Sequence, residues 1–312
     1  MNIAFVFPGQ GSQAIGMGKD FYNNFSVARD VFDEVDDALS EKLSKLIFEG
    51  TEEELIKTQN TQPSLMAVSL AIVRTIEYLS GKKIQDICSV FAGHSLGEYS
   101  AICSGGGISI RDCAKVLRAR GSLMQNSATE GEYSMAAIIG ASRNNIEFVI
   151  SEAELHGICE LANDNSKDQV VISGHDSAVN FAIAMFKDNG AKAIKLRVSA
   201  PFHCSLMKSA AIRMKNVLDN VIFQDTKIPI IDNISLELTK DISFLKEKLI
   251  EQISGTVRWR ETMDIITENY DSVHEVGSGR ILSGLFKKSY PDFNVQTLNS
   301  IKEVEEFVCI YS

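Results

Sequence analysis

A serine in a Gly-x-Ser-x-Gly motif is the clearest candidate nucleophile in the sequence. The motif, Gly93-His-Ser-Leu-Gly97, lies between an apolar run, Ile87–Ala92, and a helical stretch, Glu98–Ser104. A strand, a tight turn and a helix in this order form a nucleophile elbow, whose glycines permit a turn that lifts the serine oxygen above the sheet edge. The N–H of Leu96 then lies at a helix N-terminus, where it can face a developing oxyanion. The alternative for Ser95 is a structural turn, because the bare motif also occurs by chance.

A nucleophilic serine needs a general base, and His203 is the best placed of the five histidines. It lies after a predicted strand and before the helical stretch Leu206–Val217, and strand ends are where the sites of open α/β sheets gather. It also follows Ser95 in the chain, as the base of such an elbow serine does. The alternative for His203 is a structural role in capping the helix. The other histidines occupy the elbow itself, a helix end, a turn and a strand: His94, His156, His175 and His274.

No acidic residue stands out as the third member of a triad. Asp232, Asp271 and Glu275 lie at the ends of predicted strands, and nothing in the sequence selects one of them. A backbone carbonyl can also orient an imidazole by accepting its Nδ1–H. Both possibilities stay open.

A second glycine motif, Gly9-Gln-Gly-Ser-Gln-Ala14, matches the dinucleotide fingerprint G-x-G-x-x-A. That fingerprint requires a second strand with an acidic residue about twenty positions further on, which binds the ribose. The candidates, Asp30 and Asp33, fall inside a predicted amphipathic helix. The pattern therefore disfavours a nucleotide site.

The elements that must position these residues alternate between strands and helices. The N-terminal part indicates a strand at Ile3–Phe7, an amphipathic helix at Ser26–Leu39, a buried helix at Pro63–Leu79 and a helix from Ser109 to Gln125. The middle part changes rhythm and predicts the order β-α-β-β-α-β of a ferredoxin-like unit. After it the longer alternation resumes, with a strand at Ile228–Asp232. We therefore predict an α/β fold with a discontinuous catalytic core over residues 1–128 and 199–312, interrupted by a small α+β insertion over 129–198.

Composition and charge exclude several classes of protein. The 312 residues are 45% hydrophobic and 23% charged, values typical of a globular protein. With 31 basic and 41 acidic residues, the net charge of −10 argues against nucleic-acid or anionic-membrane binding. The longest apolar stretch, Leu65–Val73, is too short to span a membrane, and the N-terminus lacks the basic region of a signal peptide. Six scattered cysteines without a C-x-x-C pair are typical of reduced thiols, so we expect a cytoplasmic protein.

Six short motifs occur in order along the chain: Phe7-Pro-Gly-Gln-Gly-Ser-Gln13, Gly93-His-Ser-Leu-Gly-Glu98, Arg118-Ala-Arg-Gly121, Ala162-Asn-Asp-Asn-Ser166 with Gln169-Val-Val-Ile-Ser-Gly174, Pro201-Phe-His-Cys204 and Glu275-Val-Gly-Ser-Gly279. Together they resemble the malonyl-CoA:acyl-carrier-protein transacylases of dissociated fatty-acid synthesis, over essentially the whole chain. The resemblance implies an α/β-hydrolase-like core with a ferredoxin-like insertion, in agreement with the pattern of elements.

The resemblance also implies a role for each site residue. Ser95 becomes a malonyl ester, and His203 takes its proton and later helps the second thiol to attack. The N–H groups of Gln10 and Leu96 form the oxyanion hole. Arg120 pairs with the malonyl carboxylate, because its planar fork matches two oxygens.

Three further expectations concern the surroundings of these residues. The resemblance places the carbonyl that orients the histidine in the loop Val257-Arg-Trp259, which would account for the missing acid. Phe202 resembles the malonyl-selective form of its motif, which favours an unbranched acyl group. Residues two apart on a helix face different directions, so Arg118 should stay in solvent while Arg120 enters the site.

The implied substrates are malonyl-CoA and acyl carrier protein, which carries the accepting phosphopantetheine thiol. We expect no cofactor, no metal, no nucleic-acid or membrane partner, and a monomer. Carrier proteins of this pathway are acidic, so docking between two net-negative proteins needs a local basic patch. The candidate cations are Lys187, Lys192, Lys195, Arg197, Arg280, Lys287 and Lys288. Any of them can instead belong to a merely solvated charged face.

Two other functions stay open from the sequence. A serine thioesterase or esterase uses the same catalytic atoms and differs in that water resolves the acyl-enzyme. A non-catalytic scaffold that binds CoA or a carrier protein is the second, and the intact Ser95 and His203 disfavour it.

Overall fold

Two β-sheets organise the chain, which the computed structural model describes over residues 2–127, 132–198 and 200–311. The strands of the larger sheet are β1 (Ile3–Phe7), β2 (Val90–Gly93), β7 (Ile230–Ile231), β8 (Leu238–Thr239), β9 (Ser272–Val276) and β10 (Asn294–Leu298). The helices of this unit are α1 (Lys19–Asn24), α2 (Ser26–Leu39), α3 (Leu43–Glu49), α4 (Glu52–Leu55), α5 (Thr58–Ser80), α6 (Gly97–Ser104), α7 (Ile110–Asn126), α10 (Lys208–Asp219), α11 (Ile242–Glu251), α12 (Trp259–Asn269), α13 (Ile281–Ser289) and α14 (Ile301–Tyr311). The smaller unit lies between α7 and α10 in the chain and consists of β3 (Tyr133–Ile139), α8 (Arg143–Ala153), β4 (Cys159–Ser166), β5 (Gln169–His175), α9 (Asp176–Asp188) and β6 (Lys192–Lys195).

The larger sheet brings the two glycine motifs to one edge. Its strand order is β10-β9-β1-β2-β7-β8, and every neighbouring pair except β7 and β8 is parallel. In the register of β1 and β2, Phe7 lies opposite Gly93. Because parallel strands end at the same sheet edge, the loop with Gln10 and the turn with Ser95 follow from adjacent strand ends.

Strand β1 is buried on both faces, as a continuous apolar run in a parallel sheet requires. Phe5 and Phe7 join the main core with α2, α5 and α7. Ala4 and Val6 point to the opposite side, where they share a second cluster with residues of α12 and α13. Helices therefore cover both faces of this sheet.

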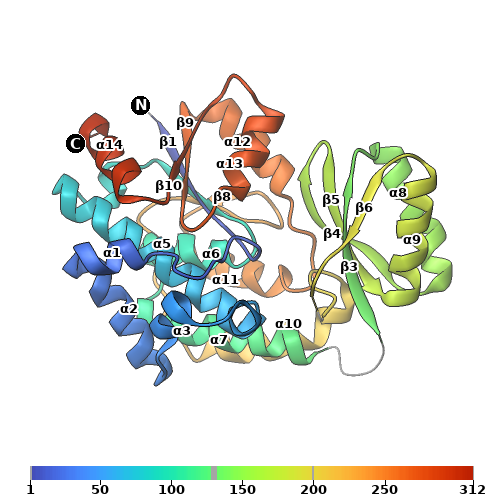
Figure 1. Cartoon of the computed structure of the whole chain (residues 1–312), viewed down its shortest axis with the longest axis horizontal. Coiled ribbons are helices and arrows are strands. Elements are labelled where there is room, and N and C mark those ends of the chain that lie inside the picture. The colour runs from blue at the N-terminus through green and yellow to red at the C-terminus, as the bar shows by residue number, and fades with distance from the viewer. Residues whose placement is uncertain (1, 128–131, 199, 312) are drawn as a thin grey trace.

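The four-stranded sheet has the order β4-β5-β3-β6 and is antiparallel throughout. Alternate residues of a strand face opposite sides. Ala136 and Ile138 pack in a small core with α8 and α9, which cover the outer face of the sheet (Figure 1). Met135 and Ala137 face the large unit and belong to its core. The inner face of the small sheet is thus a wall against the large unit.

A short β-bridge joins the two units. The Asp164 N–H donates to the Val257 carbonyl, and the Val257 N–H donates to the Ala162 carbonyl, each at 2.9 Å. The Asp164 carboxylate also binds Arg143 and Arg260, at 2.7 and 3.0 Å. These contacts hold β4 against the segment that precedes α12.

The mixed α/β fold and the helix Ser26–Leu39 are confirmed, but some predicted limits are wrong. Helix α5 begins at Thr58, five residues before the predicted start at Pro63. Residues 58–62 are polar, so they show no apolar periodicity, and Thr58 and Gln62 line a cavity instead of the core. Strand Ile87–Ala92 is shortened to β2 because a 3-10 turn at Ile84–Asp86 precedes it. The strand predicted at 228–232 is likewise shortened, to β7.

The predicted boundaries of the insertion, after residues 128 and 198, fall at positions 128, 129 and 199, which lie outside the described residues. Among the helices of the described ranges, none combines the length and apolar character needed to cross a membrane.

Candidate active site

Ser95 stands at a strained turn between β2 and α6. Its φ of 54° lies in the left-handed region, which residues with a Cβ seldom adopt. Gly97 makes the turn possible, because a Cβ at this position would lie 2.2 Å from the carbonyl oxygen of Phe7. Strain of this kind persists where the surrounding structure enforces it and is typical of elbow nucleophiles.

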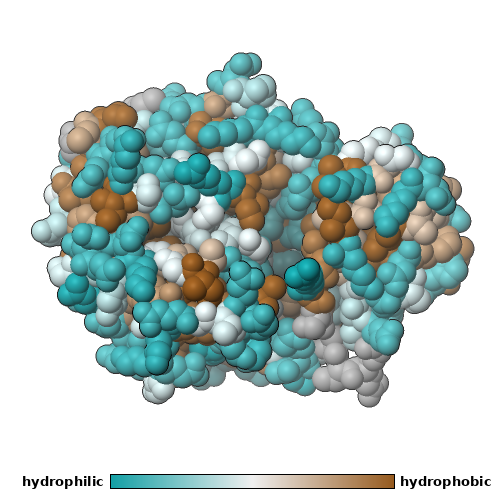
Figure 2. Space-filling view, in the orientation of Figure 1, coloured by the Kyte–Doolittle hydropathy of each residue, from teal (hydrophilic) through white to brown (hydrophobic). Residues whose placement is uncertain are grey.

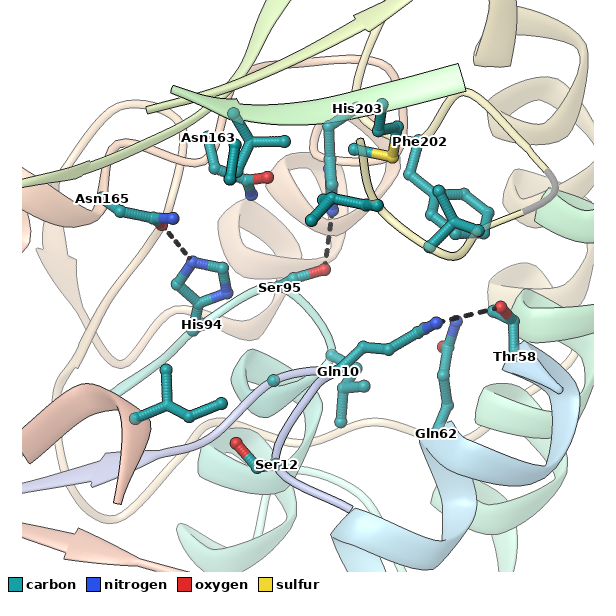
Figure 3. Close-up of a pocket in the computed structure, with 18 of the residues that line it drawn as sticks. Gln10, Ser12, Thr58, Gln62, His94, Ser95, Asn163, Asn165, Phe202 and His203 are labelled. Atoms are coloured by element: carbon teal, nitrogen blue, oxygen red, sulfur yellow. Dashed lines mark hydrogen bonds between the residues drawn. The ribbon is translucent and has the colours of Figure 1, made fainter. Parts of the chain in front are cut away.

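Ser95 and His203 form the hydrogen bond of a nucleophile–base pair. The Ser95 Oγ lies 2.7 Å from His203 Nε2, although 108 positions separate the two residues (Figure 3). His203 Nδ1 lies 2.8 Å from the carbonyl oxygen of Gln252. A carbonyl only accepts, so Nδ1 carries the proton and Nε2 is free to accept the serine proton.

The carbonyl that orients His203 belongs to Gln252, so its predicted place in the loop Val257–Trp259 is wrong. Gln252 caps the C-terminal end of α11, where carbonyl groups lack helical partners. Val257 is engaged elsewhere, since both its N–H and its carbonyl bind β4.

The three acidic candidates for a triad have other partners. Asp232 and Glu275 each accept from backbone N–H groups that follow them in the chain, and Asp271 accepts from the N–H of Asn2. Within the described residues, none of the three binds His203. The imidazole is therefore oriented by a neutral backbone carbonyl.

Arg120 is a buried cation beside the nucleophile, with only 1% of its surface exposed. Its guanidinium donates to the side-chain oxygens of Gln62 and Gln252 at 2.8 and 2.9 Å, and to Ser95 Oγ at 3.3 Å. It also lies over the ring of Tyr99, with its central carbon 5.4 Å from the ring centre. No carboxylate of the described chain forms an ion pair with it. A buried charge without a counter-ion is costly, so this group is suited to bind an anionic part of a substrate.

Arg118, two positions earlier on α7, does not line the cavity, but its predicted place in solvent is wrong, because its side chain is only 19% exposed. It forms an ion pair with Glu41 at 2.8 Å and a hydrogen bond with the Asn60 side chain. The two arginines differ in the way helical geometry requires for residues two apart.

Two backbone N–H groups flank the nucleophile without internal acceptors. Neither the Gln10 N–H nor the Leu96 N–H donates a hydrogen bond to any described residue. The Gln10 turn approaches closely because residue 9 is glycine: a Cβ there would lie 2.7 Å from the His94 carbonyl oxygen. Paired free N–H groups next to a nucleophile are what an oxyanion hole requires.

Electrostatics keep the candidate base neutral. Burial, and after it the positive charge of Arg120, lower the pKa of His203 to about 3. His203 is therefore uncharged near neutral pH and can accept a proton.

A cavity of about 300 Å³ connects these groups. In Figure 2 the surface is hollowed between the large and small units. The large unit supplies most of the polar lining: Gln10, Gln62, Ser95, Arg120 and His203. The small sheet and the residues after β6 supply apolar side chains and three amides: Met135, Ala137, Val171, Leu196, Val198, Asn163, Asn165 and Gln169. A few convergent polar groups in an apolar recess are typical of a small-molecule site.

The other histidines do not contact the nucleophile. His94 lines the cavity, but its Nε2 is 2.8 Å from Asn165 Oδ1 and its ring packs on Trp259, so it joins the elbow to β4. The remaining three lie outside the cavity lining: His156, His175 and His274.

The seven predicted docking cations are exposed but do not form one group. Three of them bind carboxylates, in the pairs Lys195–Asp176, Arg280–Glu303 and Lys288–Asp168. The other four, which form no ion pair within the described ranges, are Lys187, Lys192, Arg197 and Lys287. Arg197 borders a second hollow that shares Gln10, Thr58 and Val198 with the cavity. Among the seven candidates, it is the one that lines either of these two hollows.

Sequence reasoning missed three amide side chains of the site. Gln62 and Gln252 bind Arg120, and the Asn233 side-chain oxygen accepts the Ser95 N–H at 2.8 Å. Asn233 lies two positions after β7, so its place beyond a strand end was an available signal. The two glutamines lie on or at the end of helices and carry no local signal.

The described ranges contain no group of three His, Cys, Asp or Glu side chains placed to hold a metal ion. The six cysteines form no disulfide, and five of them are buried.

Comparison with known proteins relates this geometry to a family. The acyl transferase domain family matches residues 4–290. The malonyl CoA-acyl carrier protein transacylase of Bacillus subtilis (strain 168) is 44% identical over 290 residues, which are 92% of this chain and 90% of that protein. The crystal structure of an acyl-carrier-protein-S-malonyltransferase from Bartonella henselae is 45% identical with a TM-score of 0.97, and the match covers 100% of this chain and 99% of that one. A malonyl-transacylase solved in complex with its type II PKS acyl-carrier protein is 37% identical with a TM-score of 0.95, and the match covers 99% and 100% of the two chains.

Proposed function

The chain belongs to the acyl transferase domain family, and from this premise we propose that it transfers the malonyl group of malonyl-CoA to the phosphopantetheine thiol of acyl carrier protein, for fatty-acid synthesis. The observation that carries the proposal is the pair of Ser95 and His203 beside the buried guanidinium of Arg120. A serine nucleophile suits a thioester. A buried cation without a carboxylate partner in the described chain suits an acyl group that brings its own carboxylate.

The first half-reaction loads the serine. Ser95 Oγ attacks the thioester carbon while its proton passes to His203 Nε2, and the N–H groups of Gln10 and Leu96 stabilise the oxyanion. The C–S bond then breaks, and the departing CoA sulfur takes the proton from His203. The product is a malonyl ester of Ser95 and free CoA.

The second half-reaction uses the same atoms in reverse. The phosphopantetheine thiol of the carrier protein gives its proton to His203 Nε2 and attacks the ester carbon. The C–O bond breaks, and Ser95 Oγ recovers the proton from His203. Because CoA must leave before the second thiol enters, the two substrates react in turn.

A serine thioesterase would use the same pair of residues with water as the second nucleophile. The family match and the malonyl-transacylase names of the relatives favour transfer.

The proposal also includes the finer features of the resemblance. The strand order β6-β3-β5-β4, with both helices on one face, supports a ferredoxin-like unit. The strand–elbow–helix arrangement of β2 and α6 supports an α/β-hydrolase-like core. The reaction is redox-neutral and its proton transfers use His203, so we propose that the enzyme needs no cofactor or metal. The monomeric state and the cytoplasmic location stay predictions.

The function is tested by trapping the intermediate. The protein mixed with malonyl-CoA should gain the mass of one malonyl group on Ser95, and holo-acyl carrier protein should remove it as malonyl-carrier protein. Initial velocities plotted for the two substrates should give parallel lines. Release of free malonate at the same rate with and without carrier protein would support the thioesterase, and intersecting lines would exclude the two-step mechanism.

Acyl-enzyme formation should persist at acidic pH. The catalytic base must be neutral, and burial holds the pKa of His203 near 3, so acidification from pH 7 to pH 5 should leave the loading rate nearly unchanged. With an ordinary pKa of about 6.5, the neutral fraction of the histidine, and with it the loading rate, would fall roughly 25-fold between pH 7 and pH 5. Single-turnover loading followed by quench and intact-mass analysis measures this rate. A half-maximal rate near pH 6.5 would show that His203 titrates normally.

Carrier-protein docking should depend on Arg197 more than on the other candidate cations. Arg197 borders the hollow next to Gln10, and we expect an acidic partner that delivers a thiol to Ser95 to approach there. Arg197→Glu should raise KM for carrier protein by roughly three- to tenfold, with an effect that shrinks at high salt. Loading from malonyl-CoA reports whether the site is intact.

The matched control is Lys302→Glu, on α14, which lies on the side of the large unit away from the small unit (Figure 1). It should leave KM for carrier protein unchanged. If both charge reversals raise KM for carrier protein equally, the change in net charge alone explains the effect. If Arg197→Glu leaves this KM unchanged, the docking surface lies elsewhere.

A further inference from the structure

A buried carboxyl group lies beneath the elbow and has no part in the mechanism above. Glu98 is the second residue of α6, three positions after Ser95, and it is 0% exposed. Burying a carboxyl group is costly unless its oxygen atoms are used. The Glu98 Oε2 accepts from the Gln252 side-chain amide at 2.6 Å and from the Asn233 N–H at 3.3 Å.

Both partners of Glu98 hold the nucleophile turn. The Asn233 side chain accepts from the Ser95 N–H at 2.8 Å and donates to the Gly93 carbonyl at 2.7 Å. The Gln252 amide nitrogen also donates to the Ser95 carbonyl, at 3.1 Å. One carboxyl oxygen thus binds the Gln252 side chain and the Asn233 backbone N–H, and both of these residues hold the backbone of Ser95.

The Gln252 side chain has only one useful orientation. Its Oε1 accepts from the Arg120 guanidinium at 2.9 Å, and its Nε2 faces Glu98, Ser95 and Asn233. Turned over, the amide would present its N–H groups to the guanidinium, which has only donors. The contact with Glu98 is the shortest of the three on the nitrogen side.

We propose that Glu98 is a positioning residue, which fixes the Gln252 amide so that Gln252 offers its side-chain oxygen to Arg120 and its backbone carbonyl to His203. The inference rests on the proposed malonyl transfer. It makes Glu98 a determinant of acyl-group selectivity, because the guanidinium that meets the malonyl carboxylate is held by an amide that Glu98 orients.

Charge supports the same role. Burial, and after it the neighbouring Asp232, raise the pKa of Glu98 to about 8. A carboxyl group that is mostly protonated at neutral pH leaves the positive charge of Arg120 uncancelled for the substrate. Oε2 accepts both hydrogen bonds, and Oε1 is buried without a partner among the described residues.

Three substitutions separate orientation from simple packing. Glu98→Gln keeps an accepting oxygen and the shape of the side chain, Glu98→Met keeps the approximate size without an acceptor, and Glu98→Asp withdraws the carboxyl group by about one C–C bond. The matched control is Ser100→Ala, which changes another buried side chain of α6 whose hydroxyl has no partner among the described residues.

The measurement is kcat/KM for malonyl-CoA and for acetyl-CoA in each variant. We expect Glu98→Met and Glu98→Asp to lower the malonyl to acetyl ratio by about tenfold. Both substitutions remove the hydrogen bond that orients the Gln252 amide, and this amide supports the charged guanidinium of Arg120. Glu98→Gln should stay within about threefold of the unmodified protein, and Ser100→Ala should not change the ratio.

Equal losses for malonyl and acetyl in Glu98→Met and Glu98→Asp would overturn the inference, since a merely structural role lowers both together. The inference would also be overturned if the malonyl to acetyl ratio were as low in Glu98→Gln as in Glu98→Asp. An accepting oxygen at position 98 would then not be enough to orient the Gln252 amide. If Glu98→Met does not fold, Glu98→Asp against Glu98→Gln decides alone. Failure of the unmodified protein to load malonyl would instead refute the proposed function.

Discussion

Replacing Ser95 by alanine should abolish the malonyl-enzyme and lower malonyl transfer by about 10⁴- to 10⁶-fold, the range found when a nucleophile that acts as a unit with its base is removed. The substitution removes the oxygen that lies 2.7 Å from His203 Nε2 and leaves no other hydroxyl bonded to that nitrogen in the described chain. Radiolabelled malonyl-CoA and intact-mass analysis measure the adduct, and a coupled assay with carrier protein measures transfer.

Ser104→Ala is the matched control, because it removes a buried hydroxyl from the end of the same helix that follows the elbow. It should load malonyl as the unmodified protein does. Persistent labelling of Ser95→Ala at the same stoichiometry would move the nucleophile to another residue and remove the basis of the mechanism. Thermal unfolding should show that both variants are folded.

Replacing Arg120 by alanine should convert the protein from a malonyl-selective to an acyl-tolerant enzyme. A charge-assisted hydrogen bond in a buried pocket contributes about 1.5–3 kcal/mol, so malonyl transfer should fall roughly 10- to 150-fold. Acetyl-CoA has no carboxylate, and its transfer should be retained or improve, because a neutral acyl group no longer meets an unpaired buried cation. The malonyl to acetyl ratio of kcat/KM is the measurement.

Two further variants sharpen this result. Arg120→Lys should recover only part of the malonyl rate, because an ammonium group cannot reproduce the two-point fork. Arg118→Ala removes an arginine from the same helix, one that binds Glu41 and Asn60 outside the cavity, and should leave the ratio unchanged. An unaltered ratio in Arg120→Ala would leave malonyl selectivity without its proposed cause.

The pH profile provides a second readout of the same substitution. The Arg120 charge is the second cause, after burial, of the lowered pKa of His203. Its removal should raise that pKa, so the acidic limb of acetyl loading should move to higher pH in Arg120→Ala. No movement would mean that the two groups are electrically independent.

Features that depend on neighbouring residues could be predicted from the sequence. The elbow requires a strand, two glycines around Ser95 and a helix, all within residues 87–104. Helix Ser26–Leu39 follows from its apolar period, and the alternation of apolar segments predicted the mixed α/β fold. These features depend on local backbone geometry and on burial of one face, so the spacing of residue types along the chain predicts them.

The polar helix start before Pro63 shows where this reasoning fails. Periodicity detects a helix by its apolar face, but the first turn of α5 faces the cavity, where Thr58 and Gln62 are polar because they serve the site. The start of α5 therefore lacks the apolar periodicity by which a helix is predicted from sequence, because its residues are polar for the sake of the site.

Contacts between distant segments could not be predicted, and the environment of His203 depends on one. Every residue has a backbone carbonyl, so nothing in the sequence distinguishes the one at Gln252 from its neighbours, and the resemblance pointed to a loop five residues away. Gln252 and His203 are 49 positions apart. Their contact exists because α11 ends against the elbow, where its last carbonyl has no helical partner and an imidazole N–H fills that place.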